Sequence, residues 1–403
     1  IGIPIANNCN FKLKLNYNKT NIKINNNLES ALILYKNKKN NDLVFKENFF
    51  KSIQKYLPTC CKDIKALSEL SIKYYVNENK KKIKKNTKFN FCYVNGKKEK
   101  IDRSLAEPAC IFIGRGEHKL RGSFKPAITQ SDITLNISKG HNPKGKWKSI
   151  IHNKNVDWIA CWTDTILNKT KYVYPSSSSK VKCTGTIDKF EYARKINKKL
   201  NYIKKKYISD FKSESEKTVQ HSIALYFIDS QCIRCGTDDE NNTFGCTSLQ
   251  PNNINIKNNN ITLTFLGKDS ILFNRTFKCK YPDVIKYLQL NVKNKKSNED
   301  LFHLITSITL NSYLNTIVKD LTAKVFRTCH ASSLYNSLLY KSSSIEEFNL
   351  TINKIATLCN HTNLQTAKAN YLDPRITFAF SKRNNIDIEK LYSKQLIEKF
   401  AWA

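Results

Sequence analysis

The sequence predicts a multidomain α+β protein with a mixed N-terminal part and a mainly helical C-terminal part. The chain has 403 residues, 40% of them hydrophobic, which is enough to bury a large core divided among two to four domains. Apolar residues recur at helical spacing from residue 186 to about 345. A run of four serines at 176–179 indicates a hinge or boundary between the two parts.

The elements that justify this class can be read in order along the chain. The segment DLVFKENFFKSIQKYL (42–57) has the apolar spacing of a helix, and so do the longer segments at 191–211 and 217–234. The segment NNITLTFLGKDSILFNRTF (259–277) instead alternates as the two strands of a hairpin do. We therefore expect four segments. Residues 1–80 and 81–179 form two mixed lobes, residues 180–362 form a helical core, and residues 363–403 form a short helical end.

The charge of the chain points to a polyanionic partner. Lys and Arg total 68 against 33 Asp and Glu, a formal charge of +35, and the basic residues run through the whole chain. Such an excess is typical of proteins that bind nucleic acid. AT-rich coding accounts for part of the lysine excess, but not for individually placed arginines. The densest run, ENKKKIKKNTK (78–88), reads as a nuclear address, part of a groove or a solvated helix face.

Several other classes of protein are disfavoured. No window approaches the roughly 20 apolar residues that span a bilayer, so a soluble, intracellular protein without membrane contact is expected. An odd number of cysteines, 13 in all, favours free thiols in a reducing compartment. Cys232 and Cys235 form the one CxxC, without a second pair at zinc spacing, so we expect two buried small residues on one helix. No metal or other cofactor is expected.

What chemistry can a basic protein of this kind perform on nucleic acid? Two-metal enzymes need converging carboxylates, and the one acidic cluster, TDDEN (237–241), reads as an exposed loop. A metal-free route instead uses a covalent nucleophile, with guanidinium and imidazole donors in place of the metal. The chain offers candidates for each of these roles, namely Tyr371, Arg234, Lys268, Arg327 and His361. His330 competes for the histidine role.

Eight stretches together resemble one family, the eukaryotic nuclear DNA topoisomerase I enzymes of type IB. They are FIGRGEHK, DITLNISKG, WIACWTD, ALYFID, FLGKDS, LTAKVFRT, LCNH and NYLDPRIT. They occur in the family's order and close to its spacing, and the similarity runs from about residue 46 to the end of the chain. The resemblance implies a clamp around duplex DNA, made of mixed cap lobes and a mainly helical catalytic domain. A monomeric, nuclear enzyme is expected, and the AT-rich composition would suit a reduced nucleus such as a nucleomorph.

The resemblance also assigns roles to the five candidates. Tyr371 would attack a backbone phosphorus, giving a 3′-phosphotyrosine and a nicked strand that rotates and is resealed without ATP. Arg234 and Arg327 would hold the nonbridging oxygens, for which a guanidinium is suited because it donates two parallel hydrogen bonds. His361 would donate a third hydrogen bond. Lys268 would protonate the departing 5′ oxygen.

The resemblance implies a further set of residues at the DNA. Phosphate contacts position a duplex without reading its sequence, which suits an enzyme that acts nearly anywhere. The expected phosphate contacts are Lys171, Tyr172, Lys182, Lys189 and Lys324. Arg115 and Asp269 resemble residues that line the cleavage site, and Asn370 precedes the tyrosine as in the family. Ile113 stands where the family usually has another arginine, so one phosphate contact is weakened.

The chain departs from the family most clearly between its histidine and its tyrosine. Nuclear enzymes carry a coiled-coil linker there, whereas nine residues, TNLQTAKAN, separate His361 from Tyr371. Ten peptide steps reach at most about 35 Å, so direct closure on one phosphate is feasible. We expect a complete site without the linker, less restrained strand rotation and an altered response to camptothecin-like poisons.

Two alternatives remain at this stage. Tyrosine recombinases share the catalytic geometry, but they usually place HxxR around the second arginine, whereas this chain has KxxR at Lys324 and Arg327. The other alternative is a catalytically inactive DNA-binding relative that has kept its charge. A phosphotyrosyl adduct separates an enzyme from a binder, and synapsis of two specific sites separates a recombinase from a topoisomerase.

Overall fold

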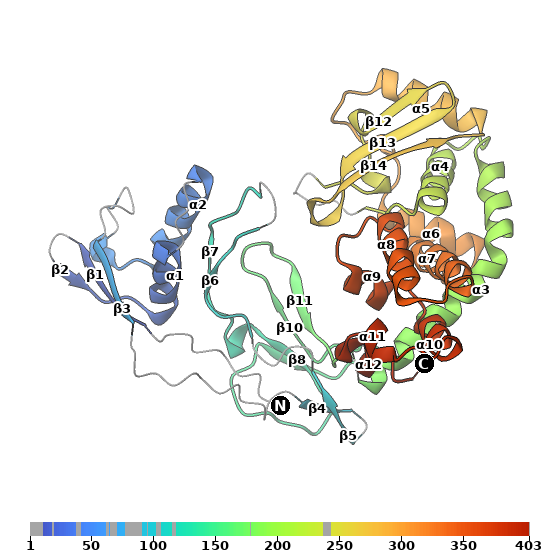
Figure 1. Cartoon of the computed structure of the whole chain (residues 1–403). Coiled ribbons are helices and arrows are strands. Elements are labelled where there is room, and N and C mark those ends of the chain that lie inside the picture. Colours follow the sequence, from blue (N-terminus) through green and yellow to red (C-terminus); the bar gives the residue numbers. More distant parts are fainter. Residues whose placement is uncertain are drawn as a thin grey trace. The chain divides into compact units, whose positions relative to one another are not determined.

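The computed structural model describes most of the chain as two compact units, residues 1–182 and 183–403 (Figure 1). The residues described are 11–17, 20–37, 42–61, 64, 71–76, 91–94, 96–101, 106–114, 118–177, 179–236 and 243–402. The charge run at 78–88 and the acidic segment at 237–241 lie outside these residues. In the sequence, the boundary between the two units falls just after the serine run at 176–179.

One of the two cores of the first unit is built from a small sheet and two helices. The sheet is antiparallel in the order β2-β1-β3. The elements are β1 (Phe11–Tyr17), β2 (Thr20–Ile22), α1 (Asn26–Asn37), α2 (Leu43–Ile53) and β3 (Ser71–Val76). Phe45, Phe49 and Ile53 form the buried stripe of α2, one residue per turn, as the spacing predicts. Asp42 caps this helix by accepting from the Phe45 N–H.

A second core of the first unit packs around a four-stranded sheet in the order β11-β10-β8-β9. Its strands are β8 (Thr134–Asn136), β9 (Ser149–Ile151), β10 (Ala160–Thr163) and β11 (Thr170–Val173). Asp164, where β10 turns toward β11, and Glu107 both lie 2.5 Å from the buried Lys125 Nζ. Two short hairpins complete the unit, β4 (Phe91–Val94) with β5 (Lys97–Lys100) and β6 (Cys110–Ile111) with β7 (Phe124–Lys125).

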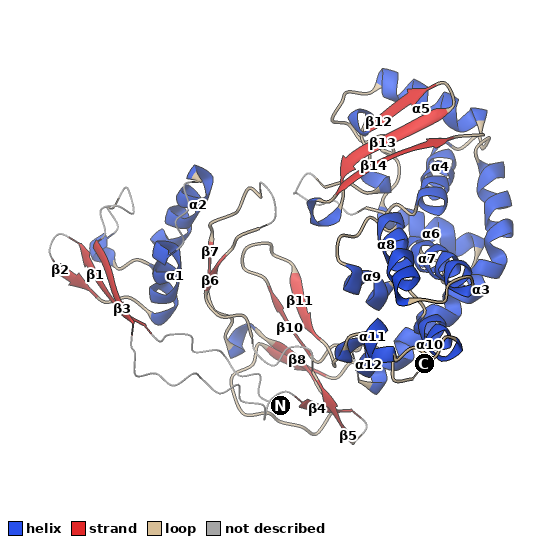
Figure 2. Ribbon diagram, in the orientation of Figure 1, coloured by secondary structure: helices blue, strands red, loops and turns tan. Residues whose placement is uncertain are grey.

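The second unit is mainly helical, with one three-stranded sheet (Figure 2). The sheet is antiparallel and consists of β12 (Ile254–Lys257), β13 (Asn260–Leu266) and β14 (Leu272–Lys278). The longer helices are α3 (Lys180–Asp210), α4 (Glu216–Gln231), α5 (Pro282–Asn294), α6 (Ser307–Ile317), α7 (Ala323–Tyr340) and α8 (Ile345–Leu358). The chain ends with α9 (Leu364–Asn370), α10 (Pro374–Arg383), α11 (Ile388–Leu391) and α12 (Lys394–Lys399).

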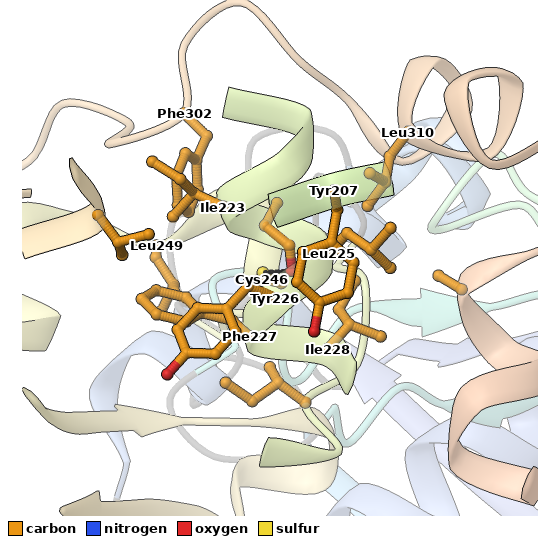
Figure 3. Close-up of a cluster of buried hydrophobic side chains, with 14 of the residues drawn as sticks. Tyr207, Ile223, Leu225, Tyr226, Phe227, Ile228, Cys246, Leu249, Phe302 and Leu310 are labelled. Carbon is orange, nitrogen blue, oxygen red and sulfur yellow. Dashed lines mark hydrogen bonds between the residues drawn. The ribbon is translucent and has the colours of Figure 1, made fainter. Parts of the chain in front are cut away.

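Helix α4 forms the centre of this unit. Every residue from 220 to 229 is buried, so the helix is covered on all sides, which is the pattern of a central core helix. Figure 3 shows Ile223, Phe227 and Ile228 of this helix among side chains from later segments, including Leu249 and Phe302. This packing fixes the end of α4, where the chain turns out of the helix.

The structure confirms the helices predicted at 42–57 and 191–211 and the hairpin predicted at 259–277, and it ends the helix predicted at 217–234 at Gln231. One prediction is wrong. Cys232 and Cys235 do not share a helix, because Cys232 takes a left-handed conformation (φ 53°) that ends α4 before Cys235 is reached. Cys232 is buried and Cys235 half-buried. The twelve described cysteines are all free thiols, as the odd total predicts.

None of the helices among the described residues has both the length and the apolar character needed to cross a membrane.

Candidate active site

Tyr371 lies directly after the short helix α9, and its side chain is 9% exposed. Its backbone N–H donates to the Ala367 carbonyl at 3.0 Å, so the residue continues the last turn of the helix. Asn363 caps the start of α9 by accepting from the Thr366 N–H at 3.0 Å. A single capped helix of two turns thus carries the chain from His361 to Tyr371.

The side chains of His361 and Arg234 meet at the Tyr371 hydroxyl. His361 Nε2 lies 3.4 Å from Tyr371 Oη and 3.0 Å from Arg234 Nη2. Each of the two comes from the residues that follow a helix. Arg234 follows α4, and His361 follows α8, where its N–H returns to the Ala356 carbonyl at 2.9 Å. Two helix ends therefore place a guanidinium and an imidazole against one phenol.

The contacts of His361 define its protonation state in this arrangement. A guanidinium can only donate, so Nε2 accepts from Arg234 and the imidazole is neutral, with its proton on Nδ1. Burial lowers the pKa of His361 to about 4, and the charges of Arg234, Arg327 and Lys268 act in the same direction. His361 can donate to a phosphate through Nε2 only after its proton moves to that nitrogen or the ring gains a second proton, which a nearby anion favours.

Arg327 lies on α7 and is 4% exposed. Its guanidinium carbon stands 4.9 Å from the centroid of the Tyr371 ring, and its Nη2 donates to the Cys359 carbonyl. The Nε atom is buried and has no hydrogen-bond partner among the described residues. A buried donor without a partner is costly, so an incoming phosphate oxygen would satisfy a group that the protein alone leaves unpaired.

Lys268 lies in the turn between β13 and β14 and is exposed. A small cavity beside it is also lined by Gly267, Arg234, Arg327 and Asn360. The turn needs unusual backbone angles, because the next two residues both have positive φ, 67° at Asp269 and 58° at Ser270. The hairpin predicted from the sequence thus brings its lysine to the cavity of the two arginines.

The backbone on either side of the tyrosine is anchored to other helices. Ser332 on α7 donates to the Tyr371 carbonyl at 2.7 Å and accepts from the Asp373 N–H at 3.2 Å. The Asp373 carboxylate is buried, and it receives Arg194 of α3 and Arg375, each at 2.9 Å. The same helix α7 therefore carries Arg327 and holds the Tyr371 backbone, so the relative positions of the two side chains are constrained.

Four of the predicted DNA contacts belong to this unit. Lys189 Nζ donates to the Asn370 carbonyl at 3.0 Å, immediately before the tyrosine. Burial and the nearby charges of Lys399 and Lys324 lower the pKa of Lys189 to about 7. Lys324 lies exposed in the first turn of α7, and Asp269 is exposed beside Lys268. Three lysines thus gather near the end of α9, next to Tyr371.

The other predicted contacts belong to the first unit. Lys171 and Tyr172 lie on β11, where Tyr172 is 46% exposed and Lys171 Nζ is 3.9 Å from the Asp164 carboxylate. Lys182 Nζ lies 4.0 Å from the centroid of the Tyr174 ring and 3.8 Å from the Asp157 carboxylate. Ile113 is 60% exposed. Arg115 lies outside the described residues.

The competing candidates have other surroundings. His330 Nε2 is 2.7 Å from Asp229 Oδ1, and Tyr207 donates to the other oxygen of the same carboxylate at 2.9 Å. His330 therefore belongs to a buried polar cluster with Asp229, whereas His361 faces the tyrosine. Over the part of the chain that the structure describes, no three His, Cys, Asp or Glu side chains gather as a metal site requires.

Two basic residues that the sequence did not indicate bind main-chain carbonyls of the helices that carry this site. Arg275 on β14 donates to carbonyls at the ends of α4 and α8, and Lys399 on α12 donates to the Ala369 carbonyl at 3.0 Å. Neither lies in a motif, and both bind main-chain oxygen. Only the assembled fold shows which carbonyls they reach.

Comparison with known proteins decides the family. Residues 178–380 match the model of the eukaryotic DNA topoisomerase I catalytic core, half of the chain, and residues 50–175 match the model of its DNA binding fragment. The chain belongs to the eukaryotic DNA topoisomerase I family. All five candidate residues of the active site lie within the matched catalytic core, and the tyrosine recombinase alternative is not favoured by these matches.

Named relatives extend the comparison over most of the chain. DNA topoisomerase 1 of Drosophila melanogaster is 29% identical over 96% of this chain, which spans about half (51%) of that protein. The human DNA topoisomerase 1 is 30% identical over 89% of the chain and 63% of its own length. The human mitochondrial DNA topoisomerase I is 29% identical, with 89% and 80% covered.

The length of these alignments bears on the short connection before Tyr371. The alignment with human topoisomerase 1 runs over 485 positions, although this chain has 403 residues. The human topoisomerase therefore contains residues that have no counterpart here.

Proposed function

We propose that this chain is a type IB topoisomerase that relaxes supercoiled duplex DNA without ATP or metal. The observation that carries the proposal is the convergence on the Tyr371 hydroxyl. His361 Nε2 lies 3.4 Å from it, Arg234 contacts His361, and Arg327 lies against the tyrosine ring. A phenol surrounded by two guanidinium groups and a neutral imidazole suits attack on a phosphodiester.

In the proposed reaction, Tyr371 Oη attacks the phosphorus and the 5′ oxygen of the next nucleotide leaves. The Tyr371 phenol releases its proton to solvent, a 3′-phosphotyrosine bond forms as the phosphodiester bond breaks, and Lys268 gives a proton to the leaving oxygen. Arg234 and Arg327 bind the nonbridging oxygens, where charge accumulates. One phosphoester replaces another, so the 5′ hydroxyl can reverse the step once the strand has rotated.

Relaxation of supercoiled plasmid in EDTA without ATP tests this function directly. The parent protein should remove supercoils under these conditions. A protein that binds the plasmid and leaves its supercoils intact would instead be a DNA-binding relative without catalysis. Stable pairing of two specific DNA sites would point to a recombinase.

His361 should remain neutral in the DNA-free protein at every pH used for activity. Burial and three nearby cations lower its pKa to about 4, so the folded state binds fewer protons than the unfolded chain between pH 4 and about 6.5. Stability from this group is accordingly present above pH 6.5 and is lost as the pH falls toward 4. NMR titration of the imidazole measures this, with His361→Gln to assign the signal.

A titration midpoint of the His361 imidazole near pH 6.5 in the DNA-free protein would contradict its burial beside three cations. Addition of duplex DNA should move the midpoint upward, because a phosphate anion offsets the charges of Arg234 and Arg327. Unchanged titration with bound DNA would show that no phosphate reaches the imidazole.

We further propose that the chain acts as a monomer that clamps the duplex, with residues 1–80 and 81–179 as cap lobes, 180–362 as the catalytic core and 363–403 as the segment that carries the nucleophile. The DNA binding fragment matched at residues 50–175 and the formal charge of +35 support a DNA partner. Lys171, Tyr172 and Lys182 would contact phosphates from the cap, as Lys189 and Lys324 would from the core. Arg115, Asp269 and Asn370 would line the DNA at the cleavage site.

Salt dependence of DNA binding measures the extent of this clamp. A protein that contacts about ten phosphates should give a slope near −9 when the logarithm of the binding constant is plotted against that of salt concentration. Fluorescence anisotropy with a labelled duplex between about 50 and 200 mM salt covers the needed range. A slope of only −2 or −3 would argue against encirclement.

We place the protein in the nucleus by family. Because a mitochondrial topoisomerase is also among its relatives, the location needs its own test. Imaging of the tagged chain in its native cell, with nuclear and mitochondrial markers, separates the two compartments.

A further inference from the structure

Arg275 lies on β14, the strand that follows the Lys268 turn, and the proposed chemistry gives it no role. Its Nη1 donates to the Gln231 carbonyl at 2.7 Å. Its Nη2 donates to the Leu358 carbonyl at 2.8 Å and also to the Thr357 carbonyl. One side chain thus binds three main-chain oxygens from two separate helices.

These oxygens belong to the last residues of α4 and α8. The final carbonyls of a helix have no partner within the helix and carry its partial negative charge, so a cation there is favourable. Arg234 comes three residues after Gln231, and His361 comes three residues after Leu358. Arg275 therefore binds the two helix ends from which the guanidinium and the imidazole of the site project.

The guanidinium is itself held in place. Its central carbon stands 4.7 Å from the centroid of the Phe273 ring on the same strand, and Phe273 is 3% exposed. Arg275 pairs with Leu263 of β13, so its backbone is fixed within the sheet. A rigid strand, a buried ring and a planar group with several donors can hold two helix ends at a constant separation.

We propose that Arg275 is a positioning residue that keeps Arg234 and His361 in register by joining the ends of α4 and α8. The inference rests on the proposed function of the same site. Arg275 acts through the main chain and does not touch the reacting atoms. Lysine cannot replace it fully, because one ammonium has no planar fork and cannot serve both helix ends at these positions.

The main test compares Arg275→Gln with Lys278→Gln in single-turnover cleavage of a duplex that traps the covalent product. Lys278 is exposed on the same strand, so the control removes the same charge without disturbing the helix ends. We expect Arg275→Gln to cleave about 30-fold more slowly and Lys278→Gln to stay within about twofold of the parent, since small displacements of catalytic groups cost up to about 100-fold. Arg275→Lys should fall between them.

A second substrate identifies the groups through which Arg275 acts. A duplex with bridging sulfur at the 5′ position of the scissile phosphate has a leaving group that needs no proton, so Lys268→Ala should recover on it. Arg275→Gln should not recover, because its defect lies at Arg234 and His361. Recovery of Arg275→Gln on this duplex would overturn the inference by placing its action at Lys268.

Four further outcomes are decisive. Equal rates for Arg275→Gln and Lys278→Gln would overturn the positioning role. Thermal melting and DNA affinity separate a general structural role, which would lower both along with the rate, from positioning, which lowers the rate alone. If Arg275→Gln does not fold, Arg275→Lys decides, and a parental rate in that variant rejects the inference. Cleavage by the parent tests the proposed function separately, and an inactive parent rejects both.

Discussion

Tyr371→Phe should abolish DNA relaxation, with a loss of at least about 10⁴-fold, because no other described group lies in its place to attack the phosphorus. The substitution removes one oxygen and keeps the ring that packs against Arg327. Binding of duplex DNA should therefore persist. The measurement is the initial rate of plasmid relaxation, taken beside the affinity for a labelled duplex.

Tyr340→Phe is the matched control for this variant. Tyr340 ends α7 and is 77% exposed, so it loses the same hydroxyl far from the buried contacts of Tyr371. The control should relax plasmid at the parental rate. Relaxation by Tyr371→Phe at more than a few per cent of that rate would mean that another residue is the nucleophile.

Arg327→Ala should lower the rate of single-turnover cleavage by about 10³-fold, equivalent to about 4 kcal/mol of transition-state stabilisation. The residue is 4% exposed, its Nε has no partner among the described residues, and its Nη2 holds the Cys359 carbonyl two residues before His361. Its loss removes a proposed phosphate donor and also frees the main chain that leads to the histidine.

Arg327→Lys separates charge from geometry at the same position. A lysine keeps the positive charge but lacks the planar fork, so we expect a loss still near 100-fold. Cleavage by Arg327→Lys at the parental rate would show that charge alone is needed there. Thermal melting of both variants, measured without DNA, reports any loss of the folded state.

Much of the fold could be predicted from local pattern. The helix at 42–57 shows its buried stripe in sequence, and Asp42 stands where a cap is expected. The hairpin at 259–277 alternates because one face of β13 is buried, with Ile261, Leu263 and Phe265 inside. Such features depend on residues close in the chain, so one sequence is enough to find them.

The end of α4 shows where local pattern fails. The apolar run continues through Cys232 and Ile233, both buried, so periodicity extends the helix to Arg234. The left-handed turn at Cys232 is set by the surrounding fold, including the hold of Arg275 on the Gln231 carbonyl. That turn is what directs Arg234 toward His361.

The candidate site could be predicted in its chemical members but not in its supports. Residue types offered a tyrosine, two arginines, a histidine and a lysine as candidates, and the resemblance of eight motifs to a known family selected these five positions. Ser332, Asp373 and Arg275 bind main-chain groups or form ion pairs across long sequence separations, and no spacing rule marks them. The contact of Lys189 with the Asn370 carbonyl likewise depends on where α3 passes α9.

The central claim is that Tyr371 joins covalently to a 3′ phosphate without a metal. The most direct measurement is to quench the protein on a nicked duplex whose cleaved strand is 5′-labelled, in EDTA, digest the adduct with protease and locate the modified residue by mass spectrometry. We expect a nucleotide linked through a 3′ phosphate to Tyr371 and to no other residue. An adduct at another side chain, a 5′ linkage, or cleavage that appears only when Mg²⁺ is restored would contradict it.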